Sequence, residues 1–402
     1  MAWLKSRIGY CSNVHPGESS DLVEENIQRY TDRLRQYRSL AFMQHGLWLS
    51  KQACTEYLSD NKKLVSLKQC LKEHHLFVVT LNAFPTGNFH AKRVKQAVYR
   101  PHWGERERLD YTLMAAEILA SLLPENQTFG TLSSLPLGYA KNWTDENQAQ
   151  ALGFLCEAVL GLSKLEATSG KHIQLCLEME PGCVLQETPE IIALFRQQLP
   201  PVAERYHLTL SQLHRYLGIC FDICHQAVMY ENIRESLCAI VNAGISIGKI
   251  QISSALRVNN PNNMLAKNWL SEFAESRYLH QVTGMTNSEG RLFADDLELA
   301  LVDTFFNTLD EWRIHFHVPV HVSSLGEQWI GTTSSDIKTV FSFLSEHPGC
   351  QPHLELETYS WGVLPEQHRP KNDEELIKGM QAEFDFIEKS MEQYKLLIRS
   401  DM

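Results

Sequence analysis

The sequence predicts an α/β fold, a closed (β/α)8 barrel of the kind called a TIM barrel. Short strand-like segments alternate with longer segments whose apolar residues recur every three or four positions. Such alternation is typical of a parallel sheet whose strands are joined by helices. A chain of 402 residues with 44% hydrophobic residues can bury so large a core. A doubly wound sheet is the rival, but no GxGxxG follows the first expected strand.

Nine segments have the composition of strands, which is one more than the barrel needs. One of them is therefore expected to lie outside it. The nine segments are residues 8–12, 46–49, 76–81, 129–133, 173–180, 217–223, 247–253, 314–322 and 354–358.

Amphipathic segments between these strands are expected to be helices. Thr144 precedes one of them as an N-cap, with acidic residues in the first turn. The clearest helical segments are residues 21–39, 108–123, 145–167, 188–199 and 335–347.

The whole chain, residues 1–402, is expected to form a single barrel domain with two additions. Residues 255–312, which include the Asn- and Pro-rich stretch "RVNNPNN", have the character of an insertion after the seventh strand. Residues 371–398 form a charged amphipathic pattern and are expected to pack outside the barrel as a C-terminal helix.

The charge balance argues against nucleic acid as a partner. The chain has 37 Lys and Arg against 48 Asp and Glu, a net charge of -11, which gives no general attraction to phosphate backbones or anionic lipid. No secretory signal is visible, and no uncharged apolar run reaches the roughly 18 residues of a membrane span. Ten cysteines without a CxxC motif indicate core thiols in a reducing compartment. We therefore expect a cytoplasmic protein without direct membrane insertion.

Polar side chains gather toward the C-terminal ends of five expected strands, where the active site of such a barrel lies. Residues two apart share one face of a strand. The polar residues at the ends of these five strands are, in chain order, Glu178 and Glu180; Asp222 with His225; Lys249, Gln251 and Ser253; His315, His317 and His321; and Glu355, Glu357 and Tyr359. Carboxylate, imidazole and amide groups together are ligands for a divalent cation such as Mn, Zn or Mg.

Asp222 lies in the apolar run "GICFDICHQAV", where a lone charge is costly to bury. A cation would neutralise the charges of Asp222 and Glu180 and would be coordinated by a ring nitrogen of His225. Each residue also has a simpler explanation. Asp222 could be a core acid held by backbone N–H groups, His225 a capping or packed histidine, Glu178 a partner of Lys249, His315 to His321 a solvent-facing strand edge, and Glu357 half of an internal ion pair.

The order of these residues resembles that of the xylose-isomerase-like barrels, which include sugar isomerases, epimerases and DNA-repair nucleases of the endonuclease IV type. The shared order is Glu on the fifth strand, Asp-x-x-His on the sixth, a polar residue on the seventh and Glu-Thr on the last. The sequence departs from the epimerase pattern at Gln251, which stands in place of a histidine. The resemblance implies a metal shell of Glu180, Asp222, His225, Gln251 and Glu357, which His317 or His321 could join.

Longer motifs resemble the EboE family of bacterial metabolite traffic proteins. They include "YCSNVHPGE", "LNAFPTGNFHAKRVKQAVYRPHW", "DICHQAV", "KIQISSALRV", "LHQVTG", "WRIHFHVPVH" and "LELETYSWGVLP". This resemblance implies the handling of a sugar-like or cyclitol-like secondary metabolite, with other proteins of the same gene cluster as candidate partners. Candidate substrate-binding residues in or beside these motifs are His15, Asn82, His90, Lys249, His280, His315 and Trp361.

If the protein is an enzyme, the resemblance implies removal of a proton next to a carbonyl group. Glu180 and Glu357 would then exchange that proton as base and acid. Two alternatives stay open. One is metal-dependent hydrolysis of a small phosphoester, and the other is a barrel that binds and transfers a metabolite without catalysis.

Overall fold

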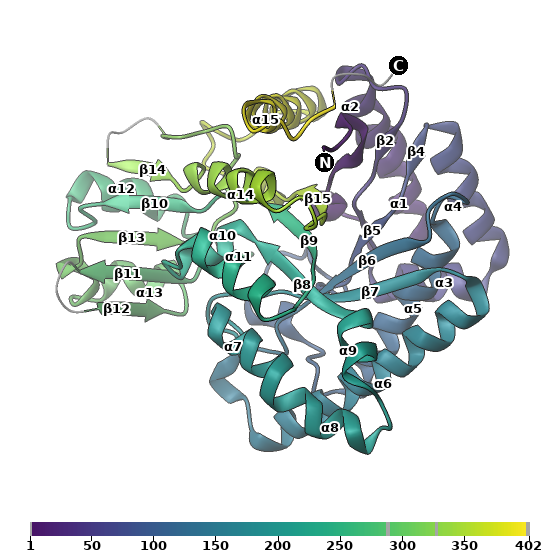
Figure 1. The fold of residues 1–402 in the computed structure, drawn as a ribbon. Helices are drawn as coiled ribbons and strands as arrows, with labels where there is room; N and C mark the ends of the chain where they lie inside the picture. The colour runs from purple at the N-terminus through teal and green to yellow at the C-terminus, as the bar shows by residue number, and fades with distance from the viewer. Residues whose placement is uncertain (1, 287–289, 326–328, 399–402) are drawn as a thin grey trace.

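The computed structural model describes residues 2–286, 290–325 and 329–398, and within them eight parallel strands form one curled sheet (Figure 1). The strands follow one another in chain order around the sheet, and a parallel bridge between Cys11 and Gly46 joins its two edges. This is the (β/α)8 barrel that the sequence predicts. Its strands are β1 (Ile8–Tyr10), β3 (Leu47–Trp48), β5 (Thr80–Asn82), β6 (Phe129–Ser134), β7 (His172–Leu177), β8 (Leu217–Asp222), β9 (Ile247–Ile252) and β15 (His353–Leu356).

The expected strand at residues 314–322 is wrong, and it is the segment that lies outside the barrel. Strand β13 (Glu311–Ile314) ends where that segment begins, and it pairs antiparallel with strands of a second sheet. Beyond it the backbone bonds to loops, since the Val318 N–H donates to Ser254 O and Pro319 has no N–H to donate. The segment is therefore a loop that crosses the end of the barrel.

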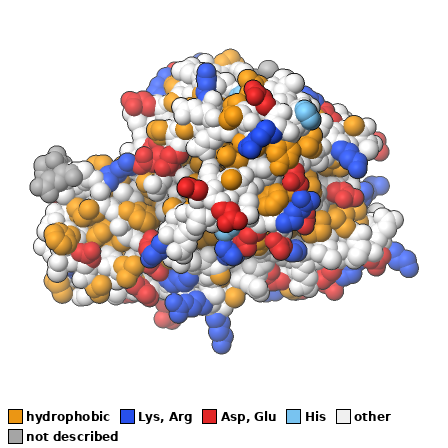
Figure 2. Space-filling view, turned by 90° about the horizontal axis from the view of Figure 1, so that it is seen from below, with side chains coloured by type: hydrophobic (Ala, Val, Ile, Leu, Met, Phe, Trp, Pro, Cys, Tyr) orange, Lys and Arg blue, Asp and Glu red, His pale blue; other side chains and the backbone are white. Residues whose placement is uncertain are grey.

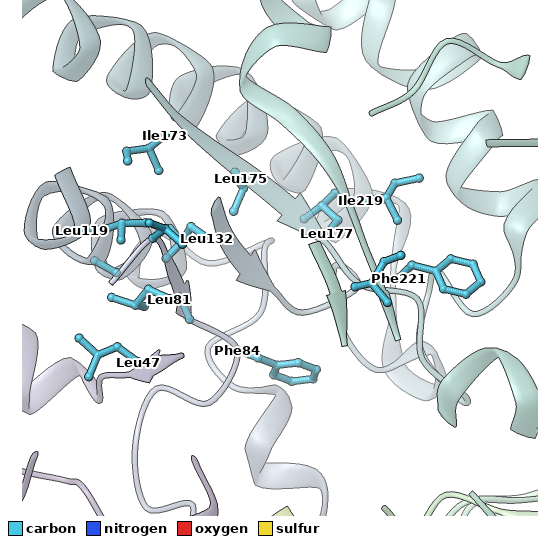
Figure 3. Packing of buried hydrophobic residues seen from close by; sticks show 14 of the residues in the cluster. Leu47, Leu81, Phe84, Leu119, Leu132, Ile173, Leu175, Leu177, Ile219 and Phe221 are labelled. Atoms are coloured by element: carbon cyan, nitrogen blue, oxygen red, sulfur yellow. The ribbon is translucent and has the colours of Figure 1, made fainter. Parts of the chain in front are cut away.

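The main core lies between the strands and the helices around them (Figure 3). Leu132, Leu175 and Ile219 come from three successive strands and pack in one cluster with Leu119 of helix α5. Alternate residues of each strand face the helices, which is why buried apolar residues recur at every second position.

Helices cover the outside of the barrel, and the caps agree with the sequence pattern. The Thr144 side chain accepts a hydrogen bond from the Asn147 N–H, as predicted, and Gly170 ends the same helix with a φ of 69°. The helices outside the inserted segment are α1 (Ser20–Asn26), α2 (Asp32–Tyr37), α3 (Lys51–Ser59), α4 (Asn61–Glu73), α5 (Arg106–Leu122), α6 (Asp145–Ser169), α7 (Thr188–Ala193), α8 (Leu199–Arg205), α9 (Leu210–Tyr216), α10 (Ile223–Val228), α11 (Ile233–Asn242), α14 (Ser335–Glu346) and α15 (Asp373–Gln393).

A second, antiparallel sheet lies to one side of the barrel, at the left of Figure 1. It occupies residues 256–332, so it reaches beyond the expected limit of 312 because its last strand pairs with its first. The sheet carries its own apolar core, to which Leu256, Val282 and Trp312 belong. Its elements are β10 (Leu256–Asn259), α12 (Met264–Ser271), β11 (Val282–Thr286), β12 (Gly290–Ala294), α13 (Leu297–Val302), β13 and β14 (Ile330–Thr332).

Three further features are a small strand pair, the position of the C-terminal helix and the distribution of charge on the surface. Strands β2 (Met43–Gln44) and β4 (Leu76–Phe77) form a separate parallel pair, and α15 packs beside α2 (Figure 1). On the face shown in Figure 2, acidic and basic side chains are interspersed. Within the described ranges, the helices are all too short or too polar to cross a lipid bilayer.

Candidate metal and substrate site

Three buried imidazoles meet at the C-terminal end of the barrel. The Nδ1 atom of each lies within hydrogen-bond distance of a carbonyl oxygen. The pairs are His225 with Met179 O at 2.9 Å, His315 with Gln281 Oε1 at 2.7 Å, and His317 with Glu357 O at 2.9 Å. A carbonyl oxygen only accepts hydrogen bonds, so each Nδ1 carries the proton and each Nε2 presents a lone pair in the neutral ring.

Two of these lone pairs face each other. His225 Nε2 lies 3.1 Å from His315 Nε2, and the Tyr359 hydroxyl lies 3.4 Å from the same atom of His315. Burial lowers the pKa of His225 to about 4 and holds the pKa of His315 well below its ordinary value. Both rings are therefore neutral at neutral pH, and their facing lone pairs repel. A cation between them would turn that repulsion into two bonds.

Asp222 ends strand β8 and at the same time caps helix α10. Its Oδ1 atom accepts hydrogen bonds from the His225 N–H at 3.0 Å and from the Ser253 hydroxyl at 2.8 Å. Its Oδ2 atom is buried and has no hydrogen-bond partner among the described residues, and the same holds for Glu178 Oε1 and His317 Nε2. Buried polar atoms are normally satisfied, so these three atoms are available to bond to a ligand.

The ligand atoms are close enough to share an ion. Those of Asp222, His225 and His317 all lie within 4.8 Å of one another, as do those of Glu180, His225 and His315. Two donors bonded at about 2.1 Å to one ion lie about 3.4 to 4.2 Å apart. A third group, Cys224 with His315 and His317, meets the same criterion. The residues present therefore fit a divalent metal, with His225 common to the first two groups.

The two candidate acid–base residues are each held by donors. The Tyr99 hydroxyl donates to Glu180 Oε1 at 2.6 Å, and the side-chain amides of Asn13 and Asn82 donate to Glu357 Oε1 at 2.8 and 3.2 Å. Burial is the main cause that raises the pKa of Glu180 to about 8 and the pKa of Glu357 well above its usual range. Without a cation, both groups favour the protonated acid at neutral pH.

A pocket opens over these groups, and it holds about 510 Å³ of space including its open mouth. Six predicted residues line it: Asn82, Glu180, His225, His315, His317 and Glu357. The structure thus brings together side chains from β5, the ends of β7 and β8, the loop after β13 and the end of β15. Asp222 is fully buried and lies in contact range of His225 and His317 without lining the pocket itself.

Other predicted residues do not reach the pocket. Lys249 is fully buried and its Nζ lies 2.6 Å from Glu355 Oε1, so its partner is Glu355 and not Glu178. Gln251 Oε1 accepts a bond from the Cys220 thiol at 3.1 Å. His321 is half-buried and belongs to none of the three ligand groups. Lys249 and Gln251 share one face of β9 as expected, but their partners hold them away from the pocket, whereas His321 lies in a loop.

The remaining predicted substrate contacts are occupied by structural bonds. The rings of His15 and Tyr30 stack at 3.8 Å, and the imidazole of His280 lies 3.0 Å from Glu275 Oε1. The Trp361 indole N–H donates to a buried carboxylate of α15, and His90 Nε2 lies 2.8 Å from Asn13 O. Of these residues, only His90 bonds to a residue that itself contacts Glu357.

Three residues that hold the site are not evident from its strand pattern. Asn13 and Tyr99 lie in short 3-10 helices, Ser12–Val14 and Lys95–Tyr99, which are too short to show a periodic pattern. Gln281 lies just before β11 of the second sheet and donates to Tyr99 Oη at 2.8 Å and to Pro181 O at 3.0 Å, which orients its Oε1 toward His315. All three lie within the longer motifs quoted above, but only proximity in the folded chain shows what they contact.

Comparison with known proteins supports the fold. No protein-family model matches the sequence, and no curated protein is significantly similar to it. Among solved structures, D-allulose 3-epimerase from Methylomonas sp. has a TM-score of 0.50 at 12% identity, covering 97% of this chain and 99% of that chain. An L-ribulose 3-epimerase has a TM-score of 0.48 at 11% identity, covering 96% of this chain and 95% of that chain. The IOLI protein, described with a bound zinc atom, has a TM-score of 0.45 at 13% identity, covering 95% of this chain and 98% of that chain.

These structural neighbours include xylose-isomerase-like barrels of sugar epimerases. At such low identity the likeness establishes the (β/α)8 fold alone. Function has to be argued from the side chains at the end of the barrel.

Proposed function

We propose that this protein is a metal-dependent isomerase or epimerase that acts on a sugar-like or cyclitol-like metabolite. The observation that carries the proposal is the convergence of three imidazole lone pairs with buried, partly unpartnered carboxylates at the end of the barrel. The epimerase neighbours share this fold, and one of them is described in complex with D-allulose.

The metal would be held by Asp222, His225 and His317, or by Glu180, His225 and His315. Imidazole nitrogen with carboxylate oxygen suits Zn or Mn, whereas Mg prefers an all-oxygen shell. When bound, the ion supplies polarisation of a substrate carbonyl or hydroxyl oxygen.

The chain itself would move the proton. Tyr99 fixes one oxygen of Glu180, and the amides of Asn13 and Asn82 fix one oxygen of Glu357. The second oxygen of each carboxyl group, which in Glu180 lies 3.9 Å from the Cys183 thiol, would accept or donate a proton at the substrate carbon. Burial raises both pKa values, to about 8 for Glu180, and a nearby cation would lower them toward the ionised form that a base requires.

A phosphoester substrate has less support. Lys95 is the cationic side chain that lines the pocket, and its Nζ is already paired with Asp296 at 2.6 Å and with Glu275 O at 3.0 Å. A phosphate group would have to compete with that pairing. We further propose that the reaction belongs to secondary-metabolite processing or traffic, with proteins of the same gene cluster as candidate partners, because the longer motifs resemble the EboE family.

The test combines metal analysis with solvent isotope exchange. We expect about one equivalent of Zn or Mn in the purified protein, and deuterium uptake from solvent into a ketohexose or inosose next to its carbonyl. Glu180→Gln and Glu357→Gln should each abolish the exchange while retaining the fold. The matched control is Glu125→Gln at an exposed position. Full exchange by both active-site variants would contradict the proposal.

A further inference from the structure

The wall of the pocket has two chemically different parts, and the part that we call the outer wall is apolar. The candidate metal ligands and the carboxyl groups form the other part. Outer lining residues include Phe84, Phe89, Val98, Tyr278 and Leu279. We infer that the ligand of this site carries an uncharged apolar substituent, of the aryl or branched-alkyl class, at the end remote from its metal-binding oxygens. This inference rests on the proposed function and narrows its substrate class.

Aromatic rings form much of this outer wall. Phe89, Tyr278 and Tyr359 contact one another, with ring centroids 5.0, 5.4 and 5.1 Å apart. Phe84 and Tyr99 form a further pair at 5.9 Å. Such rings offer large apolar faces at fixed positions, which suit a flat or branched hydrocarbon group.

Most polar atoms of the wall are already engaged, and the exception is the Tyr278 hydroxyl, which is buried without a hydrogen-bond partner among the described residues. The Tyr99 hydroxyl donates to Glu180, the Lys95 ammonium pairs with Asp296, and the Tyr359 hydroxyl lies beside His315. Hydroxyl groups of an unsubstituted sugar would lose water here and find few partners, which is unfavourable. A hydrocarbon group loses nothing on leaving water and gains the hydrophobic contribution of its buried surface.

The wall is fixed before any ligand arrives. Tyr278 and Leu279 belong to the inserted segment, whereas Phe89, Val94 and Val98 belong to the loop between β5 and α5. The two segments are joined by backbone bonds, since the N–H groups of Val94 and Lys95 both donate to Arg277 O, at 2.7 and 2.8 Å. The inserted segment therefore contributes a preformed part of the specificity pocket.

The test uses a series of myo-inositol monoethers that share one polar head: methyl, butyl and benzyl ethers, with inositol 1-phosphate for comparison. Binding to the Zn-loaded protein is measured by calorimetry. Each fully buried methylene should tighten binding about three- to fourfold, so the butyl ether should bind about 40-fold more tightly than the methyl ether. Inositol 1-phosphate should bind no more tightly than the methyl ether.

Variants of Val98 localise the effect. Val98→Asn should weaken binding of the butyl ether about tenfold and leave both metal content and methyl-ether affinity unchanged, and the milder Val98→Thr should weaken it about threefold. The matched control is Val65→Asn on the exposed face of α4, where no change is expected.

The outcomes separate the two proposals. Equal affinities for the methyl and butyl ethers on metal-loaded protein, or tighter binding of the phosphate, would overturn the apolar subsite and leave the metal site standing. A protein that binds no metal but still binds benzyl alcohol, with affinity lowered by Val98→Asn, would support the subsite and overturn the proposed function.

Discussion

Two buried carboxylates on the same strand face, Glu355 and Glu357, have partners of different charge. Glu355 lies deep in the barrel, fully buried, 2.6 Å from the ammonium of Lys249. Glu357, two residues later, is also buried, but its partners are the two neutral amides of Asn13 and Asn82. Around it lie further carboxylates and neutral imidazoles.

The difference shows where the chain supplies its own positive charge and where it does not. A buried carboxylate needs a cation, a proton or several donors, because transfer from water is costly. In the deep layer the protein supplies the counter-charge of Glu355 itself, through Lys249. At the pocket end the pKa values of Glu178, Glu180 and Glu357 are all raised, chiefly by burial, so that layer is incomplete without protons or an added cation.

Removing the deep cation should have the largest effect. Lys249→Met leaves Glu355 buried and unpaired, and we expect the free energy of unfolding to fall by about 3–5 kcal/mol. Urea denaturation measures this loss. The double variant Lys249→Met with Glu355→Leu should recover most of it, and a single variant as stable as the native protein would show that the pair is not needed.

A third buried carboxylate, Glu383 of α15, is held by donors alone: the Val320 N–H at 3.0 Å, the Thr358 hydroxyl at 2.7 Å and the Trp361 indole at 3.1 Å. Burial raises its pKa from 4.5 to about 7. The folded protein therefore binds this proton more tightly than the unfolded chain does. Its stabilising contribution is full below about pH 4.5 and is lost as the pH rises toward 7.

That loss amounts to at most about 3 kcal/mol. Glu383→Gln cannot titrate, so the stability of the variant should fall less between pH 5 and pH 7.5 than that of the native protein. Urea unfolding of both proteins with a chelator present gives the difference. Parallel pH profiles would mean that Glu383 is ionised throughout.

Removing a carboxylate from the pocket end should weaken metal binding instead of the fold. Asp222→Asn should lower the affinity for Zn about 100-fold, or about 2.7 kcal/mol, because an anionic ligand is lost. Competition with a chromophoric chelator measures the affinity. Asp385→Asn, at an exposed position of α15, is the control and should bind like the native protein.

A substitution at Gln281 distinguishes the two candidate ligand sets, because only one of them includes His315. Gln281→Leu removes the acceptor that fixes His315 Nδ1, and we expect about a tenfold loss of Zn affinity, or about 1.4 kcal/mol. Gln281→Glu keeps an acceptor and should retain the affinity. No loss in the Leu variant would assign the ion to Asp222, His225 and His317.

The smallest effect is expected at Glu178, whose Oε1 atom has no hydrogen-bond partner among the described residues. Glu178→Gln removes a carboxyl group whose ionised form is disfavoured by burial and nearby carboxylates. The metal-free variant should be more stable than the native protein at pH 8, by about 1 kcal/mol, as measured by thermal unfolding with a chelator present. A decrease would show that this carboxylate is already compensated.

The sequence by itself determined the alternation of strands and helices, and through it the barrel. It also determined which polar residues share a strand face, because side chains alternate along a strand whatever surrounds them. Glu180, Asp222, His225 and Glu357 were found in this way, and they do meet at one end of the barrel.

Tertiary structure alone decided how deep each residue lies and which partner it meets. Lys249 has the right parity but pairs with Glu355 below the pocket. His315 and His317 reach the site from the loop that follows β13 of the second sheet, not from a barrel strand. Periodicity reports the face of an element, whereas depth, register and contacts between distant segments depend on how the whole chain packs.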